Sequence, residues 1–304
     1  MKSIQVTGMG WAGRSWGSGG STDLLRAAAD RPGACAGAAA RRLTRPMDPE
    51  VLAEVFPGRW NPRRALPDGL EPLVLAFATA LEEAGWWVPG MPEPLNGALV
   101  LGTDTHYLRS AEGFARELAE RGPAGISPSG FLFSLPSSAT SILGILFGLR
   151  DYQATVTEGG LSGVRALAHA LDLLRAGRID RAAVGAISVV EDPSSPPAGA
   201  GLELAVTLCL EPIGPGRPGG SILPLIEESC ILEHPPAYAA GGCALAAGIA
   251  PVHGGLAAPG LLAVAQALEK ALEKALTRPE TIVHHEPGRP GFALVRIAPA
   301  RLEL

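Results

Sequence analysis

The most constraining feature of this sequence is a continuous apolar run over residues 182–190, which follows a regular amphipathic segment. Apolar side chains recur at helical spacing over residues 161–176, and Gly177 stands just past the end of that pattern, as is common after helices. An unbroken apolar strand is typical of one buried on both faces of a sheet. Together these two elements predict an α/β fold, in which helices cover a central sheet.

Similar signals divide the rest of the chain into elements. Strands are expected over residues 3–8, 98–102, 204–210, 222–232 and 292–297, and further helices over residues 70–85 and 261–276. Residues 126–149 carry no charge over a length that can cross a membrane, but their serines and prolines favour a buried core segment. The N-terminus lacks the apolar stretch of a signal peptide, so neither a membrane span nor a leader is expected.

Composition excludes several functional classes. The 304 residues are 47% hydrophobic, which excludes a disordered chain and is enough for one large domain or two. The net charge is −5, so there is no basic field to hold nucleic acid or an anionic membrane. The four cysteines show neither a CxxC spacing nor a histidine placed to complete a zinc site. We therefore expect a cytoplasmic protein with reduced thiols and with no metal or cofactor.

Several short segments follow one another in a characteristic order. They are Ile4-Gln-Val-Thr-Gly-Met-Gly, Asn96-Gly-Ala-Leu-Val-Leu-Gly-Thr, Ser127-Pro-Ser-Gly-Phe-Leu-Phe-Ser-Leu-Pro-Ser-Ser-Ala, Ala154-Thr-Val-Thr-Glu-Gly-Gly-Leu-Ser-Gly and Leu173-Leu-Arg-Ala-Gly-Arg-Ile-Asp-Arg-Ala-Ala-Val-Gly-Ala. In this order they resemble the β-ketoacyl synthases of the thiolase-like superfamily. The last block is the most specific, and the resemblance covers the first half of the chain much better than the second.

This resemblance implies a particular architecture. The family has a five-layer α-β-α-β-α core built from two similar halves. Here residues 1–212 would form the first half, and residues 213–304 a shortened second half packed on it as one globular unit. The family also implies a two-fold dimer across the strand that precedes the nucleophile helix.

The nucleophile position is where the sequence departs from the family. An active ketosynthase needs a cysteine thiolate at a helix N-terminus, where backbone N–H groups and the helix dipole favour the anion. Its Thr-Ala-Cys or Thr-Gly-Cys is matched here by Glu158-Gly159-Gly160, and Gly160 has no side chain to carry an acyl group. The acidic Glu158 would raise the pKa of any neighbouring thiol. The resemblance therefore implies that the condensing nucleophile is absent.

The family's other catalytic groups are also missing. Active members use two histidines and a lysine, but lysines occur here only at Lys2, Lys270 and Lys274, and no His-Gly-Thr-Gly-Thr run exists. His253, in His-Gly-Gly-Leu-Ala-Ala-Pro-Gly, resembles the second catalytic histidine. It is interpreted either as a relic of that histidine or as an ordinary loop or core residue.

The leading hypothesis is a non-catalytic ketosynthase-like subunit of the chain-length-factor type. It would pair with an active β-ketoacyl synthase in polyketide, aryl polyene or fatty-acid biosynthesis, with an acyl carrier protein as a further partner. The pocket residues expected from the resemblance are Phe131, Phe133, Gly159, Gly160, Leu161 and Ser162. Two alternatives stay open: a malonyl decarboxylase or acyltransferase that uses His253 to stabilise an enolate, and a homodimeric acyl-binding scaffold.

Other residues have both a functional and a structural interpretation, and the structural one is favoured for each. Ser162 is interpreted as a helix cap rather than a substitute nucleophile, and Cys243 as a buried thiol rather than a reactive one. His284 and His285 are adjacent strand residues rather than a metal pair, and residues 8–20 are not a dinucleotide-binding loop. The arginine cluster, a solvated surface or a contact for an acidic carrier protein, comprises Arg41, Arg42, Arg45, Arg59, Arg63 and Arg64.

Overall fold

The computed structural model describes residues 4–16, 41–42, 70–89, 95–192, 200–213, 225–232, 244–245, 280–285 and 292–298. Its helices are α3 (Leu70–Glu83), α4 (Leu108–Arg121), α5 (Pro128–Phe133), α6 (Ser138–Phe147) and α7 (Ser162–Arg175), with a 3-10 turn η1 (Gly159–Leu161). Its strands are β1 (Ile4–Trp16), β2 (Arg41–Arg42), β3 (Ala98–Thr103), β4 (Tyr152–Val156), β5 (Ala182–Asp192), β6 (Ala200–Pro212), β7 (Leu225–Leu232), β8 (Ala244–Leu245), β9 (Glu280–His285) and β10 (Phe292–Ala298).

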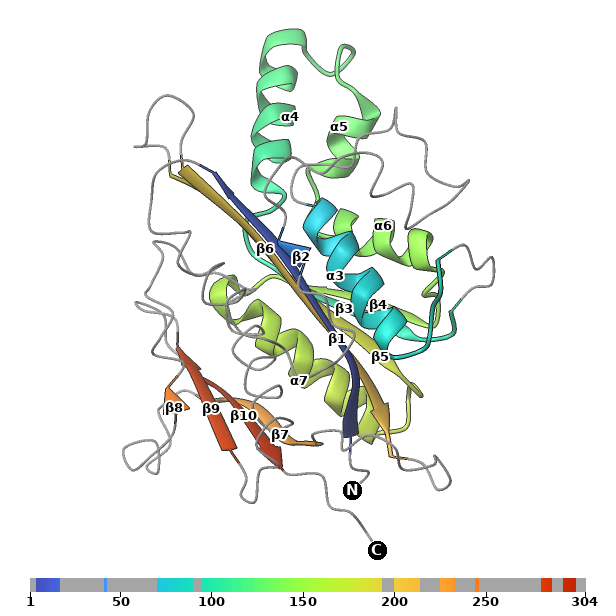
Figure 1. The fold of residues 1–304 in the computed structure, drawn as a ribbon. Coiled ribbons are helices and arrows are strands. Elements are labelled where there is room, and N and C mark those ends of the chain that lie inside the picture. Colours follow the sequence, from blue (N-terminus) through green and yellow to red (C-terminus); the bar gives the residue numbers. More distant parts are fainter. Residues whose placement is uncertain are drawn as a thin grey trace, which may run out of the picture.

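These strands form one path of paired neighbours in the order β4-β3-β5-β6-β1-β7-β10-β9-β8, with β2 beside β1 (Figure 1). The part from β4 to β5 is parallel, as the connections through α6 and α7 require, and β5, β6 and β1 are antiparallel. The part from β7 to β9 is joined to it only where Ile4 and Gln5 pair with β7. The mixed α/β fold predicted from the sequence is confirmed.

Helix α7 is the central layer of the described molecule. It packs on β3 and β5 on one side and contacts β7 and β10 on the other, while α3 covers the opposite face of the first sheet (Figure 1). The described layers therefore run α-β-α-β, in the order that the thiolase-like architecture implies. The helix expected over residues 261–276 lies outside the described residues.

The prediction for the first strand was too short. Strand β1 does not stop at Gly8 but continues to Trp16, through the glycine-rich stretch in which the strand was expected to end. The reason is close packing of α3 on this strand: a Cβ at Gly8 would lie 2.2 Å from the backbone oxygen of Ala80, and one at Gly10 would lie 2.1 Å from that of Ala76. Here the glycines make room for a helix rather than a bend in the chain.

The other predicted elements agree with the structure within a few residues. Strands β3, β5, β7 and β10 and helices α3 and α7 match their expected ranges. The predicted helix-ending glycines Gly85 and Gly177 have positive φ angles of 68° and 66°. Strand β6 is longer than expected because it pairs along its length with both β1 and β5.

The uncharged segment over residues 126–149 is only partly a core segment. Helix α6 buries one side, which includes Leu143 and Phe147, but α5 buries no side chain and Phe131 is 52% exposed. The prediction that this whole segment is buried was therefore wrong for α5. Its apolar residues face outward on a helix that lies away from the sheet. Among the described helices, none is both long enough and apolar enough to span a bilayer.

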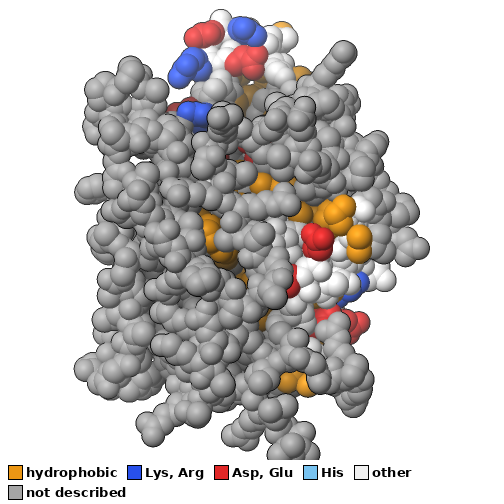
Figure 2. Space-filling view, viewed as in Figure 1, with side chains coloured by type: hydrophobic (Ala, Val, Ile, Leu, Met, Phe, Trp, Pro, Cys, Tyr) orange, Lys and Arg blue, Asp and Glu red, His pale blue; other side chains and the backbone are white. Residues whose placement is uncertain are grey.

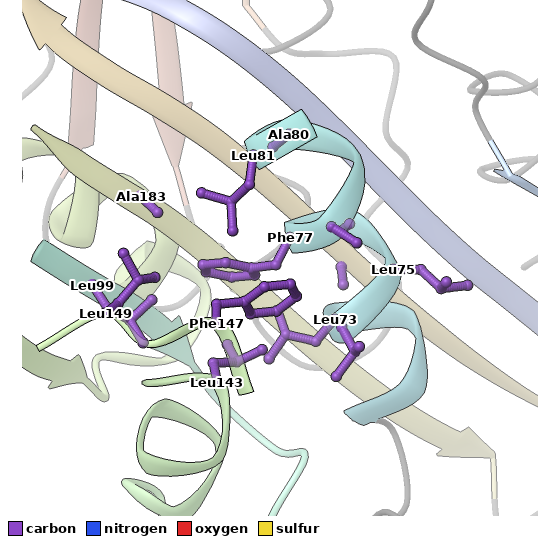
Figure 3. Packing of buried hydrophobic residues seen from close by; sticks show 14 of the residues in the cluster. Leu73, Leu75, Phe77, Ala80, Leu81, Leu99, Leu143, Phe147, Leu149 and Ala183 are labelled. Atoms are coloured by element: carbon purple, nitrogen blue, oxygen red, sulfur yellow. The ribbon is translucent and has the colours of Figure 1, made fainter. Parts of the chain in front are cut away.

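An aromatic cluster joins α3 and α6 on the sheet (Figure 3). The rings of Phe77 and Phe147 stack with centroids 6.1 Å apart, and Trp87 meets Phe147 edge-on at 5.4 Å. Gly185 of β5 makes room for this cluster, since a Cβ there would lie 2.5 Å from the Phe77 ring. Aromatic pairs of this kind stabilise beyond the area that they bury, so they fix α6 and the β4 strand that follows it.

Candidate functional site

The site is built around the turn that connects β4 to α7. After β4 the chain passes Glu158 and makes the 3-10 turn η1, with Gly159 at a φ of 59°. The Ser162 hydroxyl accepts a hydrogen bond from the Glu158 N–H at 2.6 Å and donates one to the Gly159 carbonyl at 2.7 Å. This fully buried side chain therefore holds the turn together from within.

The role of Ser162 differs from the helix cap that was expected. The residue before α7 is Leu161, which makes no side-chain capping bond, and Ser162 is itself the first helical residue. Its hydroxyl donates to a carbonyl oxygen, so within the described part of the chain its hydrogen bonds are structural and do not involve a base that could activate it as a nucleophile. The preference for a structural serine is confirmed, by a different set of hydrogen bonds from those predicted.

Gly160 occupies the position at which the resemblance places the reactive cysteine. It is buried in the middle of η1, and Leu161 beside it is 5% exposed. The start of α7 lies directly on β3, because a Cβ at Gly102 would come within 2.4 Å of the Ser162 backbone oxygen. Four of the predicted pocket residues, Gly159 to Ser162, therefore form one compact turn at the carboxyl end of the parallel strands, the usual location of ligand sites in such sheets.

The charge at this turn is balanced within the chain. The Glu158 carboxylate lies 2.8 Å from the Arg165 guanidinium, and both side chains are a little under half exposed. An exposed pair of this kind contributes little to stability. It does neutralise the acidic group that the sequence places beside the helix start.

A polar cluster that sequence reasoning missed lies at the carboxyl ends of β3 and β5. The Asp104 carboxylate accepts hydrogen bonds from the Thr105 hydroxyl at 2.9 Å and from the Ser188 hydroxyl at 3.0 Å. The neighbouring His106 is buried and hydrogen-bonds through Nδ1 to the Thr103 hydroxyl. Burial lowers the pKa of His106 to about 4, so its imidazole is neutral at pH 7. The signal was Asp-Thr-His directly after a buried strand.

Within one chain, the two predicted pocket phenylalanines belong to a different element from the turn that contains Gly160. Phe131 and Phe133 belong to α5, which with α4 projects beyond the sheet as a helical arm, residues 108–133 (Figure 1). The Phe131 ring packs on Phe114 of α4 with centroids 5.6 Å apart and remains half exposed, while Phe133 is partly buried. Charged side chains of both signs lie on the outer end of this arm (Figure 2). No contact within the described chain brings these phenylalanines to Gly160.

Strand β4 is the last strand at one end of the path of described strands, and it precedes η1 and α7 in the chain. Its sequence, Tyr-Gln-Ala-Thr-Val, has no charged residue and no proline, which are two of the devices by which natural edge strands avoid pairing. Beside it, Ile145 of α6 is 80% exposed. Within the described part of the chain, this edge therefore has the features of a strand that pairs with another polypeptide.

The remaining candidates are only partly described. His253, Cys243 and all three lysines lie outside the described residues, while His284 and His285 lie in strand β9, as their structural interpretation requires. Of the arginine cluster, Arg41 and Arg42 form β2 beside β1, and the rest lie outside the described residues. Cys209 of β6 is a buried free thiol, and burial raises its pKa. No group of three metal-ligating side chains occurs among the described residues.

By sequence, no family model and no curated protein matches the chain. By structure it is similar to a type II PKS acyl-carrier protein complex with its ketosynthase bound to the hexaketide, at a TM-score of 0.66 and 14% identity over 98% of this chain and 99% of the other. The chain has the ketosynthase-type thiolase-like fold.

Two further structures share this ketosynthase-type fold. The ishigamide ketosynthase/chain length factor matches with a TM-score of 0.62 and 14% identity over 98% of this chain and the whole of the other. A β-ketoacyl synthase from Burkholderia phymatum matches with a TM-score of 0.63 and 13% identity over 99% of this chain and the whole of the other. The α/β thiolase-like fold predicted from the sequence resemblance is therefore confirmed, whereas the division at residue 212 into two halves stays a prediction.

Proposed function

We propose that this chain is a non-catalytic ketosynthase-like subunit that pairs with an active β-ketoacyl synthase in the cytoplasm. The observation that supports this proposal is the turn before α7. Where the fold's enzymes have a thiol, Gly160 is buried without a side chain, and the nearest hydroxyl, that of Ser162, is used to hold the turn. The helix start that would activate a nucleophile is present, but none of the residues described at this turn supplies a thiol for it to activate.

Two surfaces are suited to the partner. The β4 edge has no charge or proline to prevent pairing, so it can add a strand from the partner and continue the sheet across the interface. The arm formed by α4 and α5 offers Phe131 and Leu132, which are exposed by 52% and 50%. Exposed apolar side chains gathered on one projecting element are typical of an interaction site.

In this proposal the partner supplies the thiolate and this chain shapes the space for the growing acyl chain. Replacement of a cysteine by Gly160 removes bulk, so the end of that space must be set by larger side chains. Phe131 and Phe133 are the proposed residues, reaching the pocket across the interface rather than within one chain. An acyl carrier protein would then deliver its cargo to the partner's active site. Polyketide biosynthesis is the favoured context, because structural neighbours include a ketosynthase/chain length factor.

The test is co-expression with an active type II ketosynthase encoded beside this chain, followed by light scattering and intact-mass analysis. We expect a complex of one copy of each, in which an acyl donor adds mass to the ketosynthase alone. The Gly160→Cys variant is the matched probe, because it restores a thiol at the helix start. A stable acyl adduct on the natural chain would refute the non-catalytic role, and a homodimer that ignores the ketosynthase would favour the scaffold alternative.

A further inference from the structure

The arm formed by α4 and α5 is not held in place by a core of its own. Neither helix buries a side chain, although each makes contacts with the other. The Phe114 and Phe131 rings meet at 5.6 Å, and a Glu117 carboxylate oxygen accepts a hydrogen bond from the Ser127 N–H at 3.4 Å. The two helices are therefore tied to each other, and their direction relative to the sheet depends on the two points where the arm joins it.

The first of these points is centred on Asp104. One carboxylate oxygen accepts from the Ser188 hydroxyl of β5 at 3.0 Å, and the other accepts from both the N–H and the hydroxyl of Thr105. The Thr105 hydroxyl is also within hydrogen-bond reach of the Val189 carbonyl, so its single proton is donated either to Asp104 or to Val189, and its oxygen accepts from the Val189 N–H at 3.4 Å. Asp104 thus connects the end of β3 to β5 immediately before the chain turns into α4.

The second joining point has no charged group among its described contacts. The Ser138 hydroxyl donates to the Leu132 carbonyl, the Ser138 N–H donates to that of Leu135 at 3.1 Å, and the Ser134 hydroxyl donates to that of Phe131 at 2.7 Å. These are neutral hydrogen bonds between residues close in sequence. Hydrogen bonds to a carboxylate are roughly twice as strong as neutral ones, so the Asp104 end is the firmer of the two.

We propose that Asp104 is a positioning residue, which fixes the direction in which the α4–α5 arm leaves the sheet. Its carboxylate is the acceptor shared by the arm side, through Thr105, and the sheet side, through Ser188. Ser188 is fully buried, so loss of this acceptor removes a buried hydrogen bond between the arm side and the sheet side. The effect of this positioning on partner binding rests on the proposed function, in which Phe131 of the arm contacts the partner.

Hydrogen exchange of the isolated chain tests the positioning role without a partner. In Asp104→Ala we expect amides over residues 108–133 to exchange about tenfold faster, because the arm opens independently of the sheet. Asp104→Asn is expected to retain slow exchange, since its amide oxygen still accepts from Thr105 and its NH₂ group donates to Ser188. The matched control is Asp180→Ala, which removes an exposed aspartate.

Two exchange results would overturn the proposal: unchanged exchange in the arm of Asp104→Ala, or an equal acceleration through β3, β5 and α7, which indicates general destabilisation. Binding of the same variants to the ketosynthase partner separates this proposal from the proposed function. If the natural chain fails to bind, the proposed function is wrong while the exchange data still decide the role of Asp104. If the arm loosens and binding is unchanged, the arm's proposed contact with the partner is wrong.

Discussion

The packing of α3 on β1 allows one prediction to be worked out from the structure. A Cβ at Gly10 would lie 2.1 Å from the Ala76 oxygen and 2.9 Å from the Ala80 nitrogen, both of them backbone atoms. Ordinary contact begins at 3.4 Å, so in Gly10→Ala the helix must retreat by roughly 1.3 Å. A gap of about 0.5–1 Å already forfeits a quarter to a half of the dispersion energy between the surfaces that separate, so this displacement forfeits more than that.

This retreat also lengthens the hydrogen bond from the Met9 N–H to the Glu83 carboxylate, which is now 2.7 Å. Overpacking in a core costs about 1–3 kcal/mol, and contacts that involve only backbone belong at the upper end of this range. We therefore expect Gly10→Ala to lose about 3 kcal/mol of unfolding free energy. In urea titrations followed by circular dichroism, the midpoint should fall by about 1 M.

Gly113→Ala in α4 is the matched control for this substitution. A Cβ at Gly113 would have no atom within 4 Å, so alanine there adds helix propensity without a clash. It should be neutral or stabilising, by up to about 1 kcal/mol. Equal midpoints for Gly10→Ala and the natural chain, or equal losses in the two variants, would show that the close approach of α3 to β1 does not limit stability.

Three further predictions concern buried groups. His106 has a pKa of about 4 in the folded state against 6.5 when unfolded, so the unfolded chain binds more protons between these pH values. The free energy of unfolding should therefore fall by about 3 kcal/mol as the pH drops from 6.5 to 4. Urea titrations of His106→Asn should show a clearly weaker dependence of this free energy on pH. Ser162→Ala should cost about 1–3 kcal/mol by differential scanning calorimetry, with partner acylation unchanged if the hydroxyl is structural. Phe147→Ala should cost about 3–5 kcal/mol, whereas a loss below about 1 kcal/mol in the same scans would contradict the stacking with Phe77.

The elements whose sequence pattern reports burial were predictable. The strand over residues 182–190 and the helix over residues 161–176 are apolar because they are enclosed on both sides, and the structure encloses them. The turn at Gly159 and Gly160 could be located because it falls between two such elements. Local periodicity and position in the chain are enough to find features of this kind.

Features that depend on contacts between distant segments could not be predicted. Gly8 and Gly10 looked like a turn because the sequence does not show that α3, far along the chain, lies on them. The apolar residues of α5 looked like core because composition cannot tell an interior surface from an interaction surface. The bond between Asp104 and Ser188 joins residues 84 positions apart, and although Asp104 directly follows a buried strand, nothing in the sequence pairs it with Ser188.

The uncharged β4 edge has a consequence for how much of this protein a cell can keep. In the proposed pairing, an edge strand without charge or proline can template self-association when this chain is in excess over its ketosynthase partner. Surplus copies would then be cleared or would precipitate, while copies that find a mate in time persist. The supply of the mate, rather than the synthesis rate of this chain, would set its steady-state abundance, and the balance between the two subunits would follow from the chemistry of five residues.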